Sequence, residues 1–266
     1  MKTTTTVLFA VLLLLPNLAL AIDTPPVTVD ALGSAIFRVK TGERGDIRWP
    51  ECGSYIRGDE ARLRAWQYAS LLVSAHQEYP EFDPWVGAAI IFQESSFDRC
   101  AISSEQWRQF QEAYQDRYDR DPGERDIARL LRNHTYRRSL GIPAFDAGLA
   151  QFRWPGAAAR NAGVEDPADL LDPETSISML ARALTSHYSS CEEDYSGTYT
   201  RPLRDGRVRV IRYRVSCDDG YWVQHNSPAR FNYRYYSNIV HKRDALIAAY
   251  EEISRNDSIS GSREAS

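Results

Sequence analysis

The spacing of apolar residues predicts helices along most of the chain. Over residues 59–78 apolar side chains recur along one stripe, and Asp59 can cap the start of this helix. Asp172 supplies a second N-cap, followed by a proline at the first helical position and an acid in the first turn. Shorter patterns predict a helix over residues 154–162 and another that begins at Ser237. The pattern as a whole predicts a mainly α-helical globular domain.

Residues 104–134 hold two further helical patterns. The first carries aromatic residues along one stripe: Trp107, Phe110, Tyr114 and Tyr118. Such a stripe most often marks a buried face. The alternative is a wall of a substrate groove, because aromatic rings also pack against sugar rings.

The segment over residues 199–215 has the alternation of strands instead. Asp205 and Gly206 give the signal of a tight turn, so a β-hairpin is expected. The segment also carries six arginines: Arg201, Arg204, Arg207, Arg209, Arg212 and Arg214. One interpretation is a solvated hairpin with arginines facing water. The other is a basic arm that binds carboxylates or another anionic partner.

The first 21 residues have the pattern of a signal peptide. Lys2 precedes an apolar run over residues 7–15, and residues 19–21 fit the small-x-small cleavage signal. An uncleaved N-terminal anchor is the alternative. Cleavage would leave 245 of the 266 residues, enough for one domain with its own core, in the periplasm or outside the cell. No second apolar stretch is long enough for a membrane anchor.

Composition defines the ends of this domain and limits its partners. Residues 22–50 contain paired prolines and scattered glycines and predict an extended lead-in. The domain is expected over residues 51–253, and the polar residues 254–266 predict a flexible tail. The formal net charge of -4 argues against general nucleic-acid binding.

Four cysteines, an even number in an exported chain, predict two disulfides: Cys52, Cys100, Cys191 and Cys217. Three pairings are possible. We prefer Cys52–Cys100 and Cys191–Cys217, because each bond would close a contiguous unit. A zinc site is the competing interpretation, but the cysteines show no Cys-x-x-Cys pair or Cys/His cluster.

Residues 85–97 carry the most informative chemistry. Their small and apolar composition predicts a buried helix, on which Glu94 shares a stripe with Val86, Ile90 and Phe97. Burial favours the neutral form of a carboxyl group, and Asp98 one turn further adds a like charge. Both effects would raise the pKa of Glu94, as a general acid requires. The alternative is that Glu94 lies at the rim of the helix and pairs with Arg99.

The order of several short motifs resembles a known family. Glu94-Ser95 is followed by Gly148-Leu149-Ala150-Gln151, then by His225-Asn226-Ser227-Pro228 and by Tyr236. This order resembles the soluble lytic transglycosylase family, which is related in fold to goose-type lysozyme. That family carries Glu-Ser on a buried helix, then Gly-Leu-Met-Gln, Ala-Tyr-Asn-Ala-Gly-Pro and a late tyrosine. The resemblance implies a lysozyme-like fold over about residues 85–250, with a helical insertion at about 104–141 and the hairpin at about 191–217.

The match departs from the family pattern at three positions. Ala150 replaces the methionine, His225 replaces the tyrosine of the Tyr-Asn pair, and Ser227 replaces the glycine before proline. A supporting role for His225 in substrate binding is therefore the least secure part of the transfer. Gln151 and Asn226 keep the family's residue types.

The resemblance implies cleavage of the β-1,4 bond between N-acetylmuramic acid and N-acetylglucosamine in peptidoglycan. An ordinary glycosidase needs two carboxyl groups, whereas this family uses one. Glu94 would protonate the leaving oxygen and then accept the proton of the muramic C6 hydroxyl as that oxygen closes on C1. The product is a 1,6-anhydro sugar, and no metal or cofactor is needed.

The same resemblance implies roles for the neighbouring residues. Ser95 would orient Glu94 or a sugar amide. Gln151 and Asn226 have the donors and acceptors to hold acetamido groups, and Tyr236 could form a hydrogen bond near the acid.

Three other functions stay open on the sequence. The first is a lysozyme-like hydrolase on the same fold, with water attacking and Asp98 or Asp146 assisting. The second is a protein that binds peptidoglycan without cutting it. The third is an enzyme that opens the wall for a cell-envelope or secretion apparatus, with the arginine hairpin as its docking arm. In each case glycan strands are the expected partner.

Overall fold

The computed structural model describes residues 25–42, 47–103, 105–139, 144–203, 205, 207–226 and 231–264. The expected signal peptide over residues 1–21 lies outside these residues, as do Arg204, Gly206 and Ser227. Among the described residues, no helix combines the length and the apolar composition needed to cross a membrane.

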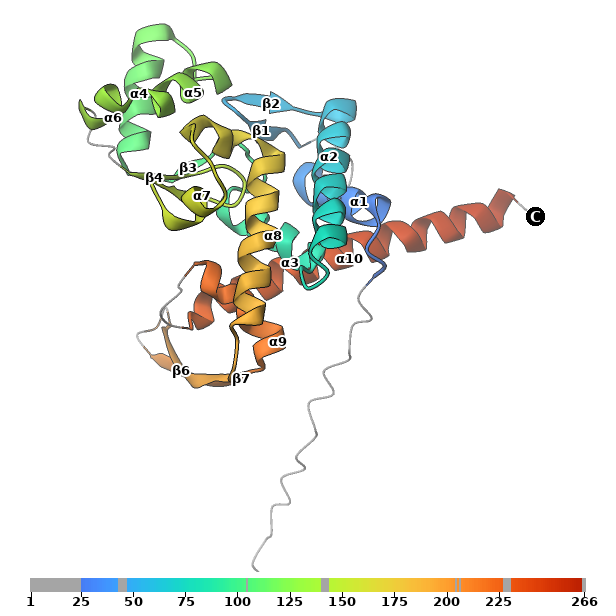
Figure 1. The fold of residues 1–266 in the computed structure, drawn as a ribbon. Coiled ribbons are helices and arrows are strands. Elements are labelled where there is room, and N and C mark those ends of the chain that lie inside the picture. The colour runs from blue at the N-terminus through green and yellow to red at the C-terminus, as the bar shows by residue number, and fades with distance from the viewer. Residues whose placement is uncertain are drawn as a thin grey trace, which may run out of the picture.

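Three helices pack together around a short buried one, which itself contacts two of them (Figure 1). The long helices are α1 (Val29–Thr41), α2 (Gly58–Glu78) and α10 (Tyr233–Glu264), and the short one is α3 (Pro84–Glu94). Helix α1 packs against both α2 and α10, and α10 also packs along α3. Every residue from 84 to 91 of α3 is buried, so its surface is covered by neighbouring elements over two turns. This arrangement sets the end of α3 against the first turns of α10.

A small antiparallel sheet and a helical insertion lie on one side of α3. The strands run in the order β3 (Ile102–Ser103), β4 (Phe145–Ala147) and β5 (Phe152–Trp154). The insertion joins β3 to β4 and contains α4 (Glu105–Tyr118), α5 (Glu124–Arg132) and α6 (His134–Ser139). A separate two-stranded sheet, β1 (Trp49–Glu51) and β2 (Ser54–Ile56), precedes α2.

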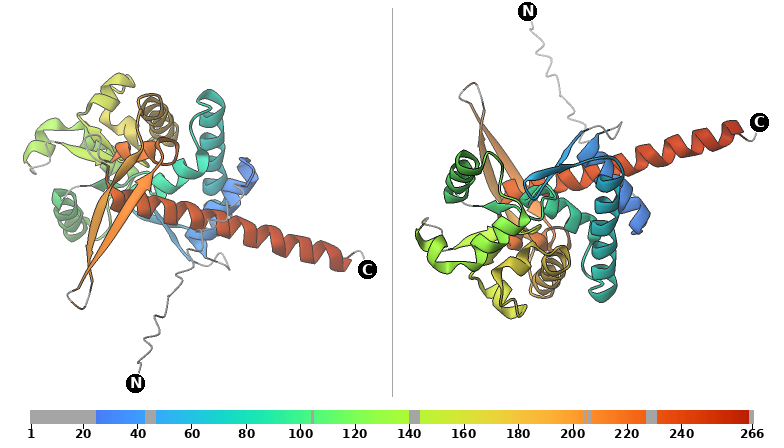
Figure 2. Two further views of the ribbon diagram at one scale, coloured as in Figure 1. Left: turned by 90° about the horizontal axis from the view of Figure 1, so that it is seen from below. Right: turned by 90° about the horizontal axis from the view of Figure 1, so that it is seen from above.

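The remaining elements complete the fold around α8 (Pro173–Ser189). They are α7 (Ala157–Asn161), η1 (Pro167–Leu171), β6 (Tyr195–Pro202), β7 (Val208–Val215), α9 (Cys217–Gly220) and η2 (Tyr221–His225). Strands β6 and β7 form an antiparallel hairpin that lies beside the beginning of α10 (Figure 2). The far end of α10 projects from the body of the molecule (Figures 1 and 2).

The predicted fold class is confirmed: the protein is mainly α-helical, with a helical insertion and a disulfide-bracketed hairpin. The preferred disulfides, Cys52–Cys100 and Cys191–Cys217, are both present. The buried-face interpretation of the aromatic stripe holds for Trp107 and Phe110, which are 7% and 6% exposed, whereas Tyr118 is 50% exposed. Asp172 caps α8 as predicted and accepts a hydrogen bond from Thr175 N at 2.9 Å.

Three expectations about helix positions are wrong. Residues 29–41 were expected to be extended, but Thr28 caps α1, whose apolar face lies in the core. The helix expected to begin at Ser237 begins at Tyr233, and its described part continues through the expected tail to Glu264. The helix expected over residues 154–162 is limited to α7, because Phe152–Trp154 pairs in β5.

Candidate active site

Glu94 is the last residue of the buried helix α3. Asp83 caps the start of this helix by accepting a hydrogen bond from Trp85 N at 2.8 Å, and Pro84 occupies the first position. Ser95 is the C-cap residue, and its hydroxyl donates to Ile91 O at 3.0 Å. The Ser95 side chain is therefore bonded to its own helix in the structure. Glu94 stands where the covered helix opens into a turn.

The turn after Glu94 has an unusual backbone. Ser96 and Phe97 both have positive φ, 53° and 62°, a conformation that costs a non-glycine residue about 1–3 kcal/mol. Contacts on both sides hold the turn. The Phe97 ring is fully buried, and the Lys40 ammonium donates to Ser96 Oγ at 2.9 Å. Asp98 accepts hydrogen bonds from the backbone N–H groups of both residues in the first disulfide, Cys52 and Cys100, at 3.0 and 2.9 Å.

The surroundings of Glu94 favour a protonated carboxyl group. Burial raises its pKa, and the charge of Asp146 on β4 raises it further. A hydrogen bond from the Tyr235 hydroxyl acts in the opposite direction. Glu94 Oε1 and Tyr235 Oη are both buried without a hydrogen bond of good geometry. A buried carboxyl group with a raised pKa and an unsaturated oxygen has the properties of a general acid.

The charged residues that act on Glu94 differ from those expected from the sequence. Asp146, not Asp98, is the carboxylate that raises the pKa of Glu94. Arg99 does not pair with Glu94, because its guanidinium holds Glu51 at 3.0 Å and both oxygens of Glu124 at 2.9 and 2.6 Å. The interpretation of Glu94 as a surface ion-pair residue is therefore wrong.

Gln151 lies at the end of a tight loop between β4 and β5. Gly148 has φ of 81°, and an added Cβ there would collide with the Leu170 carbonyl oxygen. Gln151 itself has φ of 53°, and its amide nitrogen donates to Ala101 O and Gly148 O at 2.9 and 2.8 Å. One of these hydrogen bonds ties the loop to the residue before β3, and the other closes the loop on itself. The amide oxygen is the group left for a ligand.

His225 joins this loop to the segment before α10. A ring nitrogen, Nε2, lies 2.9 Å from Ala150 O, and the ring meets Phe152 edge to face. Burial lowers the pKa of His225, so the neutral ring is favoured. Asn226 is exposed at the end of η2 and accepts a hydrogen bond from the Asn232 amide at 3.3 Å.

The tyrosine beside the acid is Tyr235 rather than the expected Tyr236. The Tyr236 ring stacks on Trp222 at 5.2 Å with 7° between the planes, and the groups that shift its pKa are Asp219, Arg243 and other residues outside the Glu94 site. Tyr235 is 5% exposed, and burial together with Glu94 holds its pKa well above the usual value. Its hydroxyl therefore remains protonated and can donate to Glu94.

Residues 72–201 match the family model described as the transglycosylase SLT domain. The match supports assignment of this part of the chain to the soluble lytic transglycosylase family. The SLT domain is lysozyme-like and acts on peptidoglycan. No curated protein and no solved structure matched the chain. The matched segment contains Glu94, Ser95 and Gln151, whereas α1 and α10, which supply Lys40 and Tyr235, lie outside it.

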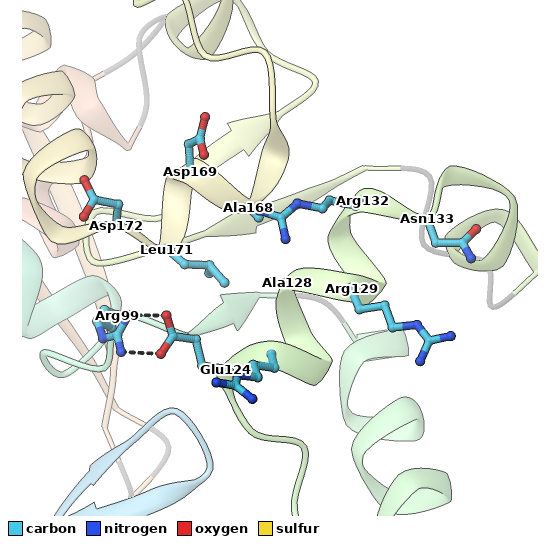
Figure 3. Close-up of a pocket in the computed structure, with 11 residues that line it drawn as sticks. Arg99, Glu124, Ala128, Arg129, Arg132, Asn133, Ala168, Asp169, Leu171 and Asp172 are labelled. Carbon is cyan, nitrogen blue, oxygen red and sulfur yellow. Dashed lines mark hydrogen bonds and ion pairs between the residues drawn. The ribbon is translucent and has the colours of Figure 1, made fainter.

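An open pocket of about 710 Å³ lies between α5 of the insertion and η1 of the SLT domain (Figure 3). Its walls carry the Arg99–Glu124 pair and the exposed side chain of Arg129, and Glu94 does not line it. Arg132 of α5 pairs with Asp166, the cap of η1, at 2.6 Å. These contacts fasten the insertion to the rest of the domain, and the pocket lies at this boundary.

The nearest approach to a metal-ligand cluster among the described residues is Cys52, Asp98 and Cys100. Both sulfur atoms belong to the disulfide, and the Asp98 carboxylate caps backbone N–H groups. The disulfide and the Asp98 carboxylate therefore stabilise the turn after Glu94.

Proposed function

We propose that the protein cleaves the β-1,4 bond between N-acetylmuramic acid and N-acetylglucosamine, with Glu94 as the acid and then the base. The observation that carries this proposal is the carboxyl group of Glu94, held at the end of a buried helix with its pKa raised by burial. Peptidoglycan as the substrate follows from the SLT domain.

The proposed reaction is an intramolecular transglycosylation. Protonated Glu94 donates its proton to the glycosidic oxygen as the bond from muramic C1 to that oxygen breaks, and N-acetylglucosamine leaves with a free O4 hydroxyl. The Glu94 carboxylate then accepts the C6 hydroxyl proton while O6 bonds to C1, which closes the 1,6-anhydro ring. The Tyr235 hydroxyl supports the second step, because it donates to the carboxylate form of Glu94.

The other predicted site residues have supporting roles in this proposal. The oxygen of the Gln151 amide accepts from a sugar acetamido N–H, since its nitrogen is already used by the loop. The exposed Asn226 binds a second acetamido group. Neutral His225 holds the Gln151 loop against η2 through Ala150 O.

A hydrolase is the second candidate, because Asp146 is close enough to Glu94 to raise its pKa. A second carboxylate could activate water or stabilise the positive charge at C1. In the structure, however, Asp146 is engaged by Arg153 at 3.4 Å. The Asp146–Arg153 ion pair favours the transglycosylase, and the products decide between the two.

The test is product analysis after incubation with isolated peptidoglycan sacculi. The released muropeptides are identified by mass spectrometry for three proteins: the unaltered protein, Glu94→Gln and Glu165→Gln, a control at an exposed position. Anhydro-muropeptides that are absent only with Glu94→Gln are expected. If the products instead carry reducing ends and are absent only with Glu94→Gln, the protein is a hydrolase with Glu94 as its acid. Release of the same products by Glu94→Gln would overturn the role of Glu94.

We also propose that the protein is exported and that its signal peptide is cleaved after residue 21, because its substrate lies in the cell wall. N-terminal sequencing of the protein recovered from the cell envelope tests this. A sequence that begins at Ile22 is expected, whereas one that begins at Met1 would contradict it.

A further inference from the structure

A groove of about 510 Å³ lies where the β6–β7 hairpin meets the first turns of α10. Aromatic and basic side chains from both elements line it, among them Tyr199, Arg201, Arg209, Tyr233 and Arg234. Its described lining contains no acidic residue. The hairpin lies beside the first turns of α10 (Figure 2), and residues of both elements line the groove.

No ion pair neutralises the arginines of this groove among the described residues. Arg201 and Arg209 lie directly opposite each other in the hairpin register. Their like charges repel, which destabilises the pairing of the two strands at this position. Over the part of the chain that the structure describes, Arg201, Arg209 and Arg234 have no ion pair. Two other arginines of the hairpin do: Arg207 pairs with Asp205 and Arg214 with Asp194. An anionic ligand would relieve the repulsion between the groove arginines.

The aromatic side of the groove is fixed in place. Tyr233 stacks on Tyr213 with ring centres 4.8 Å apart, and Tyr199 lies against Tyr233 at 5.3 Å. The Tyr213 ring also stacks on Phe231 at 5.2 Å. Tyrosine rings that are held by stacking offer a surface for the apolar parts of a ligand at little cost in conformational entropy.

The groove is also close to the catalytic acid along α10. Tyr233 and Arg234 line the groove, and the next residue, Tyr235, meets Glu94. Residues of one helical turn lie within about 5 Å along the axis, so the groove and Glu94 both contact the first turn of α10. A ligand that is attached to the bound sugar fits this spacing.

We propose that the groove binds the carboxylates of the peptide stem on the muramic acid of the bound strand. This rests on the proposed function, because the stem reaches the groove only while the glycan lies at Glu94. Arginine is suited to this task, since its planar guanidinium forms paired hydrogen bonds to a carboxylate. The stem also supplies short apolar side chains that pack on Tyr199 and Tyr233.

The test compares ligands with and without a stem. The double variant R201E/R209E reverses the charge of the groove. R212E is the matched control, because Arg212 is an exposed hairpin residue that does not line the groove. Calorimetric titration with a disaccharide tetrapeptide and with the same disaccharide lacking the peptide measures the contribution of the stem.

We expect the protein and R212E to bind the stem-bearing ligand at least about 10-fold more tightly than the bare disaccharide. R201E/R209E should lose this preference. R201Q/R209Q, which removes the charges without reversing them, should lose most of it and provides a second variant if charge reversal impairs folding. An unchanged preference in both double variants, or no preference in the unaltered protein, would overturn the proposal.

A parallel cleavage assay separates this result from the proposed function. Glycan strands freed of peptide by an amidase should be cut by the protein and by R201E/R209E at similar rates, and not by Glu94→Gln. If the unaltered protein cuts neither kind of strand, the proposed function fails. The titration still decides whether the groove recognises the stem.

Discussion

The Tyr235 hydroxyl and the Glu94 carboxyl group are buried next to each other where the first turns of α10 meet the end of α3. Among the described residues, neither Tyr235 Oη nor Glu94 Oε1 has a hydrogen-bond partner of good geometry. Catalytic hydrogen bonds are often poorly aligned before substrate binds and tighten in the complex. The pair therefore leaves the proton of Glu94 available to a substrate oxygen, while Tyr235 is placed to support the carboxylate that forms.

Replacement of Tyr235 by phenylalanine should slow cleavage about 10- to 100-fold, because a hydrogen bond to a charged group contributes about 1.5–3 kcal/mol. The same change should raise the pKa of Glu94, since the Tyr235 hydroxyl lowers it. The falling limb of kcat/KM against pH should then move to higher pH. Tyr236→Phe is the control, because the Tyr236 ring stacks on Trp222 and its hydroxyl does not act on Glu94. Equal pH profiles for Tyr235→Phe and the unaltered protein would contradict this role.

Asp146 gives a prediction of opposite sign. Its charge raises the pKa of Glu94, so Asp146→Asn should lower that pKa and move the falling limb to lower pH. Glu94 would then be protonated over a narrower pH range, but cleavage should persist at pH values well below the falling limb. The measurement is kcat/KM against pH on soluble glycan strands, with Glu165→Gln as the control. Loss of cleavage at every pH would instead make Asp146 essential and favour the hydrolase.

The burial of Glu94 also has a consequence for stability. Because the folded pKa is raised, the folded protein keeps this proton to higher pH than the unfolded chain does. The free energy of unfolding should therefore fall as the pH rises above the unfolded pKa of about 4.3. Glu94→Gln removes this effect, so its Tm should exceed that of the unaltered protein at pH 7. The two melting curves should converge below about pH 4, and a lower Tm for Glu94→Gln at pH 7 would contradict the raised pKa.

The sequence predicts those parts of the fold that depend on local signals. Asp172 and the proline after it specify the start of α8, and the structure has that cap. The position of Glu94 on a buried helix also follows from the spacing of its apolar neighbours. The like charge beside Glu94 could not be predicted in this way, because Asp146 approaches from β4 after an insertion of three helices.

The sequence contains a signal for the start of α10 that distinguishes Tyr235 from Tyr236. Asn232 accepts a hydrogen bond from Tyr235 N at 3.1 Å, so a cap stood five residues before Ser237. From that start, Tyr235, Ile239 and Leu246 recur at helical spacing, and all three are buried. Tyr236 falls on another face of α10. The motif order alone selects Tyr236, whereas the helical period selects Tyr235.

The loop that carries Gln151 supplies the last prediction. Gly148 and Gly163 both have positive φ, 81° and 75°, so alanine at either position should cost about 1–2 kcal/mol through the backbone alone. A Cβ at Gly163 meets no atom within 4 Å, whereas one at Gly148 collides with the Leu170 carbonyl oxygen. Gly148→Ala should therefore destabilise the protein by about 1–3 kcal/mol more than Gly163→Ala.

Urea unfolding of the two alanine variants measures this difference, and cleavage of sacculi adds a second readout. Gly148→Ala should also reduce cleavage under conditions where it remains folded, because the Gln151 amide is held by Gly148 O and by Ala101 O, just before β3. Gly163 follows α7, and a Cβ there would meet no atom of that loop, so Gly163→Ala should cut at the normal rate. Equal stability and equal cleavage in the two variants would show that the close approach of Gly148 to η1 does not hold the Gln151 loop in place.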